Sequence, residues 1–378
     1  MFVLELYSGI GGMHCAFERS SLKYKVVQAV DINDVATTTY KHNFPETPTF
    51  NRIIESLDEG SILRLGADTW SLSPPCQPFT RLGNRKCEED SRSDSFLHVL
   101  DLIKSCRPKK LILENVKGFE YTEPWRQLIQ TLDVCDYEYE QFLLSPLQFG
   151  VPNCRLRFYL VARLKSSNSV DGYNLFSKPH GPSTADSIHM ITPLDAPKLP
   201  DCNCPACTNL VKHVTNPDEN FTQYDPYCQP ILNFLLSENK DSKKQFTFLT
   251  DDVLTRYFPV LDIVRGCDTK TRCFTKGYSK RFDGTGSVLQ TKKLSLTRED
   301  IHSRFLLNRD NPTGLLSLAR SLGLRFFHSS EVASLLCFPG SFGFPDNVTE
   351  KQRIRLLGNS LNVLVVAHLI YWAFSNVT

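Results

Sequence analysis

The sequence predicts an α/β protein: a mostly parallel sheet covered by helices on both faces, with a smaller domain inserted before the last helices. Short apolar runs alternate with helical patterns from Phe2 to Ala162, the order in which crossover helices join parallel strands. Proline, asparagine, serine and aspartate interrupt this alternation over 166–252, and helical patterning returns at Phe326. A chain of 378 residues is also too long for one small hydrophobic core. We expect one domain from residues 1–163 and 325–378, and a second from 164–324.

The individual elements follow from their patterns in chain order. Strands are predicted where apolar residues run together, at 2–7, 25–30, 69–72, 110–113, 139–144 and 158–162. Helices are predicted after the glycine turn at 8–12 and at 33–43, 57–65, 93–106 and 125–132. Long loops are expected within 166–252, whereas 262–290 has a basic, β-like pattern.

Composition excludes several classes of protein. Hydrophobic residues make up 41% and charged residues 22% of the chain, as in a soluble globular protein. No run of eighteen apolar residues is present, so we expect no membrane span. A strand starting at Phe2 leaves no room for a signal or transit peptide. The 13 cysteines are odd in number and scattered, which favours reduced thiols in the cytoplasm or nucleus. A net charge of +2 neither supports nor excludes a nucleic-acid partner.

A proline-rich loop, Ser71–Arg81 (SLSPPCQPFTR), follows the strand predicted at 69–72. Pro74 and Pro75 cannot continue a sheet ladder, so the strand should end there. Each proline also favours an extended conformation of the residue before it. Cys76 is therefore presented from a stiff loop at the edge where open α/β sheets bind ligands. A reactive thiol is the favoured interpretation, and a buried packing cysteine is the alternative.

A glycine turn and an acidic residue form a candidate cofactor site. Gly9, Gly11 and Gly12 would let the backbone approach a ligand at a helix N-terminus. His14 stands where a dinucleotide fingerprint needs its third glycine. Asp31 ends the second strand about twenty residues on, where an acid binds ribose hydroxyls. Together they fit a nucleoside such as S-adenosylmethionine. A tight turn and a helix N-cap at Asp31 are the structural alternatives.

Charged residues at two other strands are further candidates. Glu114 begins the triplet ENV that ends the run KLILENV, where apolar surroundings could raise its pKa and let it donate a proton. A surface pair with Lys109 or Lys117 is equally open. Arg155 and Arg157 are two apart on a predicted strand, so both should face one side. They require anions or acceptors there, and structural pairing is the alternative.

A basic segment, 265–298, contains nine lysines or arginines and two aspartates. Phe274, Tyr278 and Phe282 are interleaved with these charges. This mixture suits phosphate contacts combined with base stacking. A solvated β-ribbon is the alternative.

A cysteine cluster lies within the predicted long loops. The run DCNCPACTN contains Cys202, Cys204 and Cys207, and His213 follows six residues later. Structural zinc sites use four ligands, usually from two pairs. Only one tight cluster is present, so we expect a flexible loop and no metal.

The ordered motifs resemble those of the C5-cytosine methyltransferase family. LELYSGIGG and AVDIN resemble its cofactor motifs, PPCQPFTR its nucleophile motif, ENVKGF its glutamate motif, RLR its arginine motif and RLLGNSLNV its closing motif. The resemblance covers about 1–163 and 325–374. RCFTKGY and the wording of PPCQPFTR, LENVKGFE and RLLGNSLNV resemble the branch that methylates cytosine 38 of tRNA-Asp. Residues 166–252 depart from the family.

The resemblance implies an S-adenosylmethionine-dependent methyltransferase fold, a Rossmann-like sheet with an inserted target-recognition domain. It implies that Cys76 is the nucleophile, that Glu114 is the acid at N3 of the base, and that Arg155 and Arg157 support the target cytosine. The implied cofactor residues are Ile10, Gly11, Gly12, Asp31, Ile32, Ile54, Glu55, Ser73 and Asn362. The implied target residues are Gln77, Thr80, Cys273, Phe274, Thr275 and Lys276.

The same resemblance implies methyl transfer to an anticodon-loop cytosine of tRNA, with tRNA-Asp as substrate, through a covalent Cys76 adduct. DNA cytosine methylation is the alternative activity. A catalytically silent nucleic-acid-binding protein is the alternative of another class. The expected protein is a monomer that binds tRNA, has weak or no activity on duplex DNA and binds no membrane.

Overall fold

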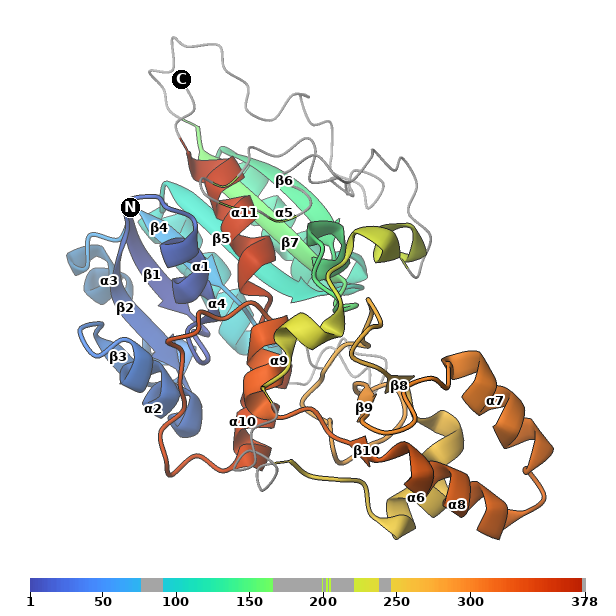
Figure 1. The fold of residues 1–378 in the computed structure, drawn as a ribbon. Coiled ribbons are helices and arrows are strands. Elements are labelled where there is room, and N and C mark those ends of the chain that lie inside the picture. Colours follow the sequence, from blue (N-terminus) through green and yellow to red (C-terminus); the bar gives the residue numbers. More distant parts are fainter. Residues whose placement is uncertain are drawn as a thin grey trace.

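The computed structural model describes residues 1–75, 91–165, 199, 202, 204, 221–237 and 246–375. In this part of the chain the large sheet has the strand order β3-β2-β1-β4-β5-β7-β6 (Figure 1). Its strands are β1 (Phe2–Leu6), β2 (Lys25–Asp31), β3 (Thr49–Asn51), β4 (Thr69–Leu72), β5 (Lys110–Val116), β6 (Tyr137–Leu144) and β7 (Arg157–Leu164). Strands β1 to β5 pair in parallel, and β7 runs antiparallel to both its neighbours. The predicted mostly parallel α/β sheet is confirmed.

Helices cover both faces of this sheet, because its side chains alternate between two hydrophobic cores. On β5, Ile112 belongs to one core, and Leu111 and Leu113 belong to the other. The first core also contains side chains of α1 and α11, which pack against each other, and the second contains those of α4 and α5. The helices around the sheet are α1 (Gly12–Arg19), α2 (Asp34–Asn43), α3 (Glu59–Arg64), α4 (Ser91–Cys106), α5 (Glu123–Val134), α9 (Ser329–Leu335), α10 (Glu350–Gly358) and α11 (Val363–Phe374).

One described segment, Glu350–Phe374, is long and apolar enough to cross a membrane by length and composition, with a mean hydropathy of 1.4. It is divided into α10 and α11. Its most apolar window is 72% buried inside the protein, and α11 packs against α1 over the large sheet (Figure 1). Its apolar character is therefore that of a core helix.

A smaller body of structure lies beside the large sheet (Figure 1). A three-stranded sheet, in the order β10-β9-β8, has its own hydrophobic core with the neighbouring helices. These elements are α6 (Asp251–Tyr257), β8 (Ile263–Val264), β9 (Val288–Gln290), α7 (Arg298–Leu307), α8 (Pro312–Leu322) and β10 (Leu324–Arg325). The β-like pattern expected over 262–290 is wrong for most of its length. Ser279, Gly284 and Gly286 have positive φ there, so turns replace an extended strand.

A buried ion pair joins the small sheet to helix α9. Arg325, the last residue of β10, donates two hydrogen bonds of 2.8 Å to Glu331, and the two side chains are 1% and 0% exposed. Glu331 also accepts hydrogen bonds from the backbone N–H groups of Leu236 and His328. The Arg325 guanidinium lies 4.0 Å from the ring centroid of Phe246. The two charges thus pair with each other directly, and Arg325 Nε is the guanidinium nitrogen left without a hydrogen-bond partner among the described residues.

We predict that Glu331→Ala lowers the free energy of unfolding by about 3–5 kcal/mol, because it leaves the Arg325 charge buried without its partner. Chemical denaturation monitored by circular dichroism measures the change. Glu123→Ala is the matched control, since its pair with Arg126 is exposed and should contribute little. Equal stability of the two variants would contradict the structural role of the buried pair.

Candidate active site

The candidate site lies at the carboxyl ends of β1, β4 and β5, where a cavity of about 290 Å³ opens. This is the sheet edge at which open α/β folds bind ligands. Nine of the residues that the family resemblance implies for catalysis, cofactor binding or target binding line the cavity: Ile10, Gly12, Asp31, Ile32, Ser73, Glu114, Arg155, Arg157 and Lys276. They come from six separate stretches of the chain, which the fold brings together.

Other predicted cofactor residues lie outside the cavity lining. Gly11 has a φ of 88° as the N-cap of α1, and a Cβ there would come within 2.5 Å of Phe44. Ile54 is buried in the core, and Glu55 is exposed beside it. Asn362 is buried and caps α11 by accepting a hydrogen bond from Val365 N. These placements give Gly11, Ile54 and Asn362 packing and capping roles.

Asp31 holds the glycine turn in place. Its Oδ2 accepts a hydrogen bond from Gly9 N at 2.8 Å, and its Oδ1 accepts one from Asn33 N at 2.8 Å. The helix N-cap interpretation of Asp31 is wrong, because Asn33 caps α2 by accepting from Ala36 N. Burial raises the pKa of Asp31, and these backbone hydrogen bonds oppose the rise. The carboxylate therefore stands at the cavity wall with its orientation fixed by the turn that it supports.

The proline segment after β4 forms another wall of the cavity. Pro74 and Pro75 line it, and Asn115 Nδ2 donates a hydrogen bond of 3.4 Å to Pro74 O. Since β4 and β5 are parallel neighbours, this bond fixes the proline segment to the residue after Glu114. The sequence analysis gave Asn115 no role, although it stands inside the ENV motif. Cys76, Gln77 and Thr80 lie outside the described residues.

Glu114 is buried and paired with an arginine from the neighbouring strand. It is 9% exposed, and its Oε1 lies 3.5 Å from Arg157 Nε. The alternative surface pair with Lys109 or Lys117 is therefore wrong. Burial raises the pKa of Glu114, and the charges of Arg157 and then Arg155 oppose the rise. A carboxyl group in this environment can hold a proton at a pH where an exposed glutamate has lost it.

The two arginines meet at one cysteine. Arg155 Nη1 lies 3.4 Å from Cys273 Sγ, and Arg157 Nη2 lies 3.6 Å from the same atom. The expected shared strand is wrong in detail, because β7 begins at Arg157 and leaves Arg155 in the preceding loop. Burial would raise the pKa of Cys273, but the charges and hydrogen bonds of Arg157 and Arg155 outweigh it, so this pKa is lowered. The cluster thus favours a negative or electron-rich group beside both guanidinium groups.

The closing motif after α10 packs against the turn that carries Cys273. A Cβ at Gly358 would lie 2.3 Å from the backbone of Thr275 and Lys276, so only glycine allows this approach. The next residues line the cavity, and Ser360 O accepts a hydrogen bond from Arg155 Nη2. The sequence analysis assigned only Asn362 of this motif. The glycine within RLLGNSLNV was the available signal for a close backbone contact.

The aromatic residues of the basic segment do not form a stacking surface. Phe274 and Tyr278 are 2% and 4% exposed and pack edge-to-face, with Phe274 also against Phe327. Phe282 stacks on Tyr257 at 4.5 Å. The stacking interpretation is wrong for Phe274 and Tyr278, because they fill the core between the segment and the chain after β10. Lys276, Lys280 and Arg281 of this segment are exposed, and Lys276 lines the cavity.

Comparisons with known proteins agree with this architecture. Residues 1–373 match the family described as C-5 cytosine-specific DNA methylase. The chain is 41% identical to a tRNA (cytosine(38)-C(5))-methyltransferase of Bos taurus, over 97% of both chains. It is 32% identical to a DNA (cytosine-5)-methyltransferase of Dictyostelium discoideum, over 97% of this chain and 93% of that one. A crystal structure of a DNMT2 mutant of Spodoptera frugiperda is 35% identical, with a TM-score of 0.75 and 99% of each chain covered.

The chain therefore belongs to the C-5 cytosine-specific DNA methylase family. Its methyl donor is S-adenosylmethionine, and it is a cytosine-C5 methyltransferase. The cavity fits this cofactor. Its lining combines the carboxylate of Asp31, the apolar side chains of Ile10 and Met13, and the N-terminus of α1, which together suit the polar and apolar parts of a nucleoside.

We predict that Gly358→Ala lowers the free energy of unfolding by about 1–3 kcal/mol, because the added methyl group overlaps backbone that cannot rotate away. A shift of about 1 Å in this contact should also slow methyl transfer by about 10²-fold. Gly340→Ala is the control, since a Cβ there meets no atom within 4 Å. Thermal unfolding and turnover should both separate the variants; identical behaviour would reject the close contact.

Proposed function

We propose that this enzyme methylates carbon 5 of cytosine 38 in tRNA, with tRNA-Asp as substrate, through a transient bond between Cys76 and carbon 6 of the base. The observation that carries the proposal is Glu114, buried with a raised pKa beside Arg155 and Arg157 at the edge of the cavity. The printed names of relatives that match along nearly the whole chain support tRNA as the substrate.

The chemistry requires activation of the ring, because carbon 5 of cytosine is a poor nucleophile. Attack of the Cys76 thiolate on carbon 6 forms a carbon–sulfur bond and places negative charge on the ring. A proton held by Glu114 and shared with N3 stabilises that charge, so that the ring becomes an enamine. S-adenosylmethionine supplies an electrophilic methyl group when bound. Loss of the proton from carbon 5 then expels the thiolate and restores the aromatic ring.

The arginines and the exposed lysines have separate roles in this proposal. Arg157 holds Glu114 in position and, with Arg155, offers hydrogen bonds to the carbonyl oxygen of the target base. Lys276 at the cavity, and the exposed Lys280 and Arg281 that follow it, suit tRNA phosphates. The target base must leave its stack, and an anticodon loop makes this easier than a duplex does.

We expect labelled S-adenosylmethionine to transfer its methyl group to tRNA and weakly or not at all to duplex DNA, when both are assayed side by side. The Dictyostelium relative, named as a DNA methyltransferase, makes DNA the second candidate substrate. Cys76→Ala is the control that should abolish transfer while leaving cofactor binding intact. Faster labelling of duplex DNA than of tRNA would reject the proposed substrate. Full activity of Cys76→Ala would reject the covalent mechanism.

Glu114→Gln tests the proposed proton donor. The amide keeps the shape of the side chain but cannot supply a proton, so kcat should fall by about 10²–10⁴-fold. The Michaelis constant for tRNA should change little, because phosphate contacts away from the base dominate affinity. Glu120→Gln is the matched control, since Glu120 is also buried with a pKa raised by burial but does not line the cavity.

The pH dependence gives a second readout for Glu114. The raised pKa means that activity requiring the protonated acid extends to a higher pH than an exposed glutamate would allow, and is lost as the pH rises through that pKa. Ionisation of the Cys76 thiol acts in the opposite direction, so the wild-type profile of kcat should be bell-shaped. The alkaline decline should disappear in Glu114→Gln. An unchanged profile, or turnover within about threefold of wild type, would remove Glu114 from the mechanism.

A further inference from the structure

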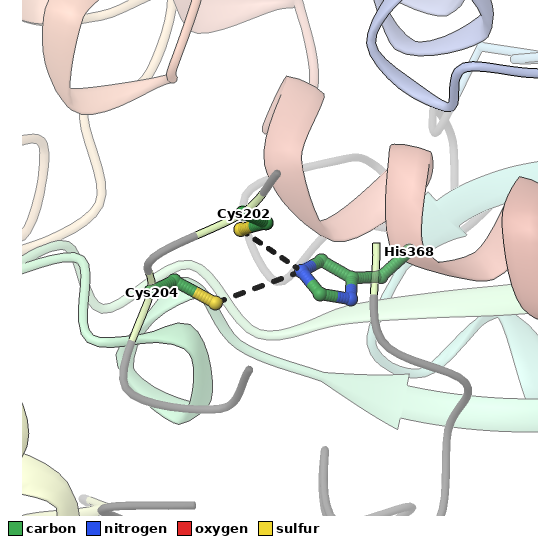
Figure 2. A group of neighbouring side chains, drawn as sticks. All are labelled: Cys202, Cys204 and His368. Carbon is green, nitrogen blue, oxygen red and sulfur yellow. Dashed lines mark hydrogen bonds between the residues drawn. The ribbon is translucent and has the colours of Figure 1, made fainter. Parts of the chain in front are cut away.

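A cysteine–histidine cluster lies outside the active site. It joins two cysteines of the inserted region, the segment between β7 and α6, to a histidine of helix α11. The thiols of Cys202 and Cys204 both face the imidazole of His368 (Figure 2). His368 Nε2 is 3.7 Å from Cys204 Sγ and 4.0 Å from Cys202 Sγ. All three donor atoms lie within 4.8 Å of one another. The sequence analysis considered His213 as the partner of these cysteines, whereas the fold brings His368 to them across 164 residues.

We propose that Cys202, Cys204 and His368 bind a zinc ion that ties the inserted region to α11. A tetrahedral zinc ion with its usual bond lengths places a sulfur and a nitrogen ligand about 3.6 Å apart and two sulfurs about 3.8 Å apart. The observed sulfur–nitrogen distances of 3.7 and 4.0 Å are close to this spacing. Small side-chain rotations would bring the three atoms onto one ion.

The chemistry of the donors selects the metal. Two thiolates and one imidazole suit zinc, whereas calcium and magnesium prefer oxygen ligands. Cys204 and His368 are 8% and 2% exposed, and the Phe149 ring lies 4.8 Å from the imidazole ring. An apolar surrounding of this kind strengthens metal–ligand bonds and limits access of water. In the sequence, Cys207 follows Cys204 at the two-residue gap that zinc-binding cysteine pairs use.

Zinc would add an interaction that the hydrogen bonds alone do not provide. The cysteines belong to the segment between β7 and α6, whereas His368 lies on a core helix. Binding replaces two thiol protons, which leave to solvent, by two sulfur–zinc bonds. The free energy of these bonds stabilises the folded state and increases with pH, because the ligands must be deprotonated. The site is structural, and it lies apart from the residues that line the cofactor cavity.

The decisive measurement is the metal content of the full-length protein, purified without a chelator from zinc-supplemented cells. We expect about one zinc per chain by plasma mass spectrometry, as a single structural site holds one ion. Replacing zinc by cobalt should produce thiolate-to-cobalt charge-transfer absorption in the near ultraviolet. This spectrum reports sulfur ligation directly, and it requires no variant to fold. Wild-type protein without zinc, and without this absorption when titrated with cobalt, would overturn the proposal.

Variants identify the ligands. Cys204→Ser and Cys202→Ser are nearly isosteric substitutions. Loss of a residue that only hydrogen-bonds to a metal ligand weakens metal binding by about 10–100-fold. Loss of a ligand itself should weaken zinc binding by more than this. Cys106→Ser is the matched control, because Cys106 is half-buried like Cys202 but lies on α4. Zinc should raise the Tm of wild type and of Cys106→Ser but not that of Cys204→Ser. Equal zinc content and equal Tm shifts in all variants would show that these thiols bind no ion.

Discussion

The active site depends on an imbalance of buried charge: one carboxylate, Glu114, faces two guanidinium groups, Arg155 and Arg157. Burial favours the protonated carboxyl group, while the arginines favour its ionised form, so the pKa of Glu114 results from their competition. Arg155 Nε has no hydrogen-bond partner among the described residues. A buried donor of this kind is costly unless an acceptor completes it. The carbonyl oxygen of a target base can accept this hydrogen bond. The excess of positive charge that influences the pKa of Glu114 therefore also favours binding of the base.

This charge cluster forms only where four distant segments meet. Glu114 lies near the end of β5, the arginines precede and begin β7, Cys273 lies on a turn of the smaller body, and Ser360 belongs to the closing motif. Gly358 lets the last two segments approach to backbone contact. The smaller body therefore supplies part of the catalytic cavity as well as basic surface. The position of the smaller body depends in turn on the buried ion pair of Arg325 and Glu331, which joins β10 to α9.

The sequence predicted those features that local patterns determine. Apolar runs located the strands of the large sheet, and the order of motifs placed Glu114 beside the proline loop and Asp31 beside the glycine turn. The predictions from the sequence were wrong where contacts between distant residues determine the structure. Phe274 is buried because Phe327 packs on it, and Arg155 leaves the strand to reach Ser360, 205 residues away. Local spacing suggested His213, which lies outside the described residues, for the cysteine cluster, and no sequence pattern connects Cys204 with His368.

Helix α11 links the cysteine cluster to the active site. Asn362 caps its first turn, directly after residues 358–361, which line the cofactor cavity. His368 follows six residues later, about 9 Å along the helix axis at 1.5 Å per residue. Nearly every side chain of α11 is buried, and the helix packs on α1, which begins at the glycine turn. A bond that holds His368 therefore restrains the helix whose first residues complete the cavity. The segment that carries the two cysteines would thus stabilise the part of the fold on which cofactor binding depends.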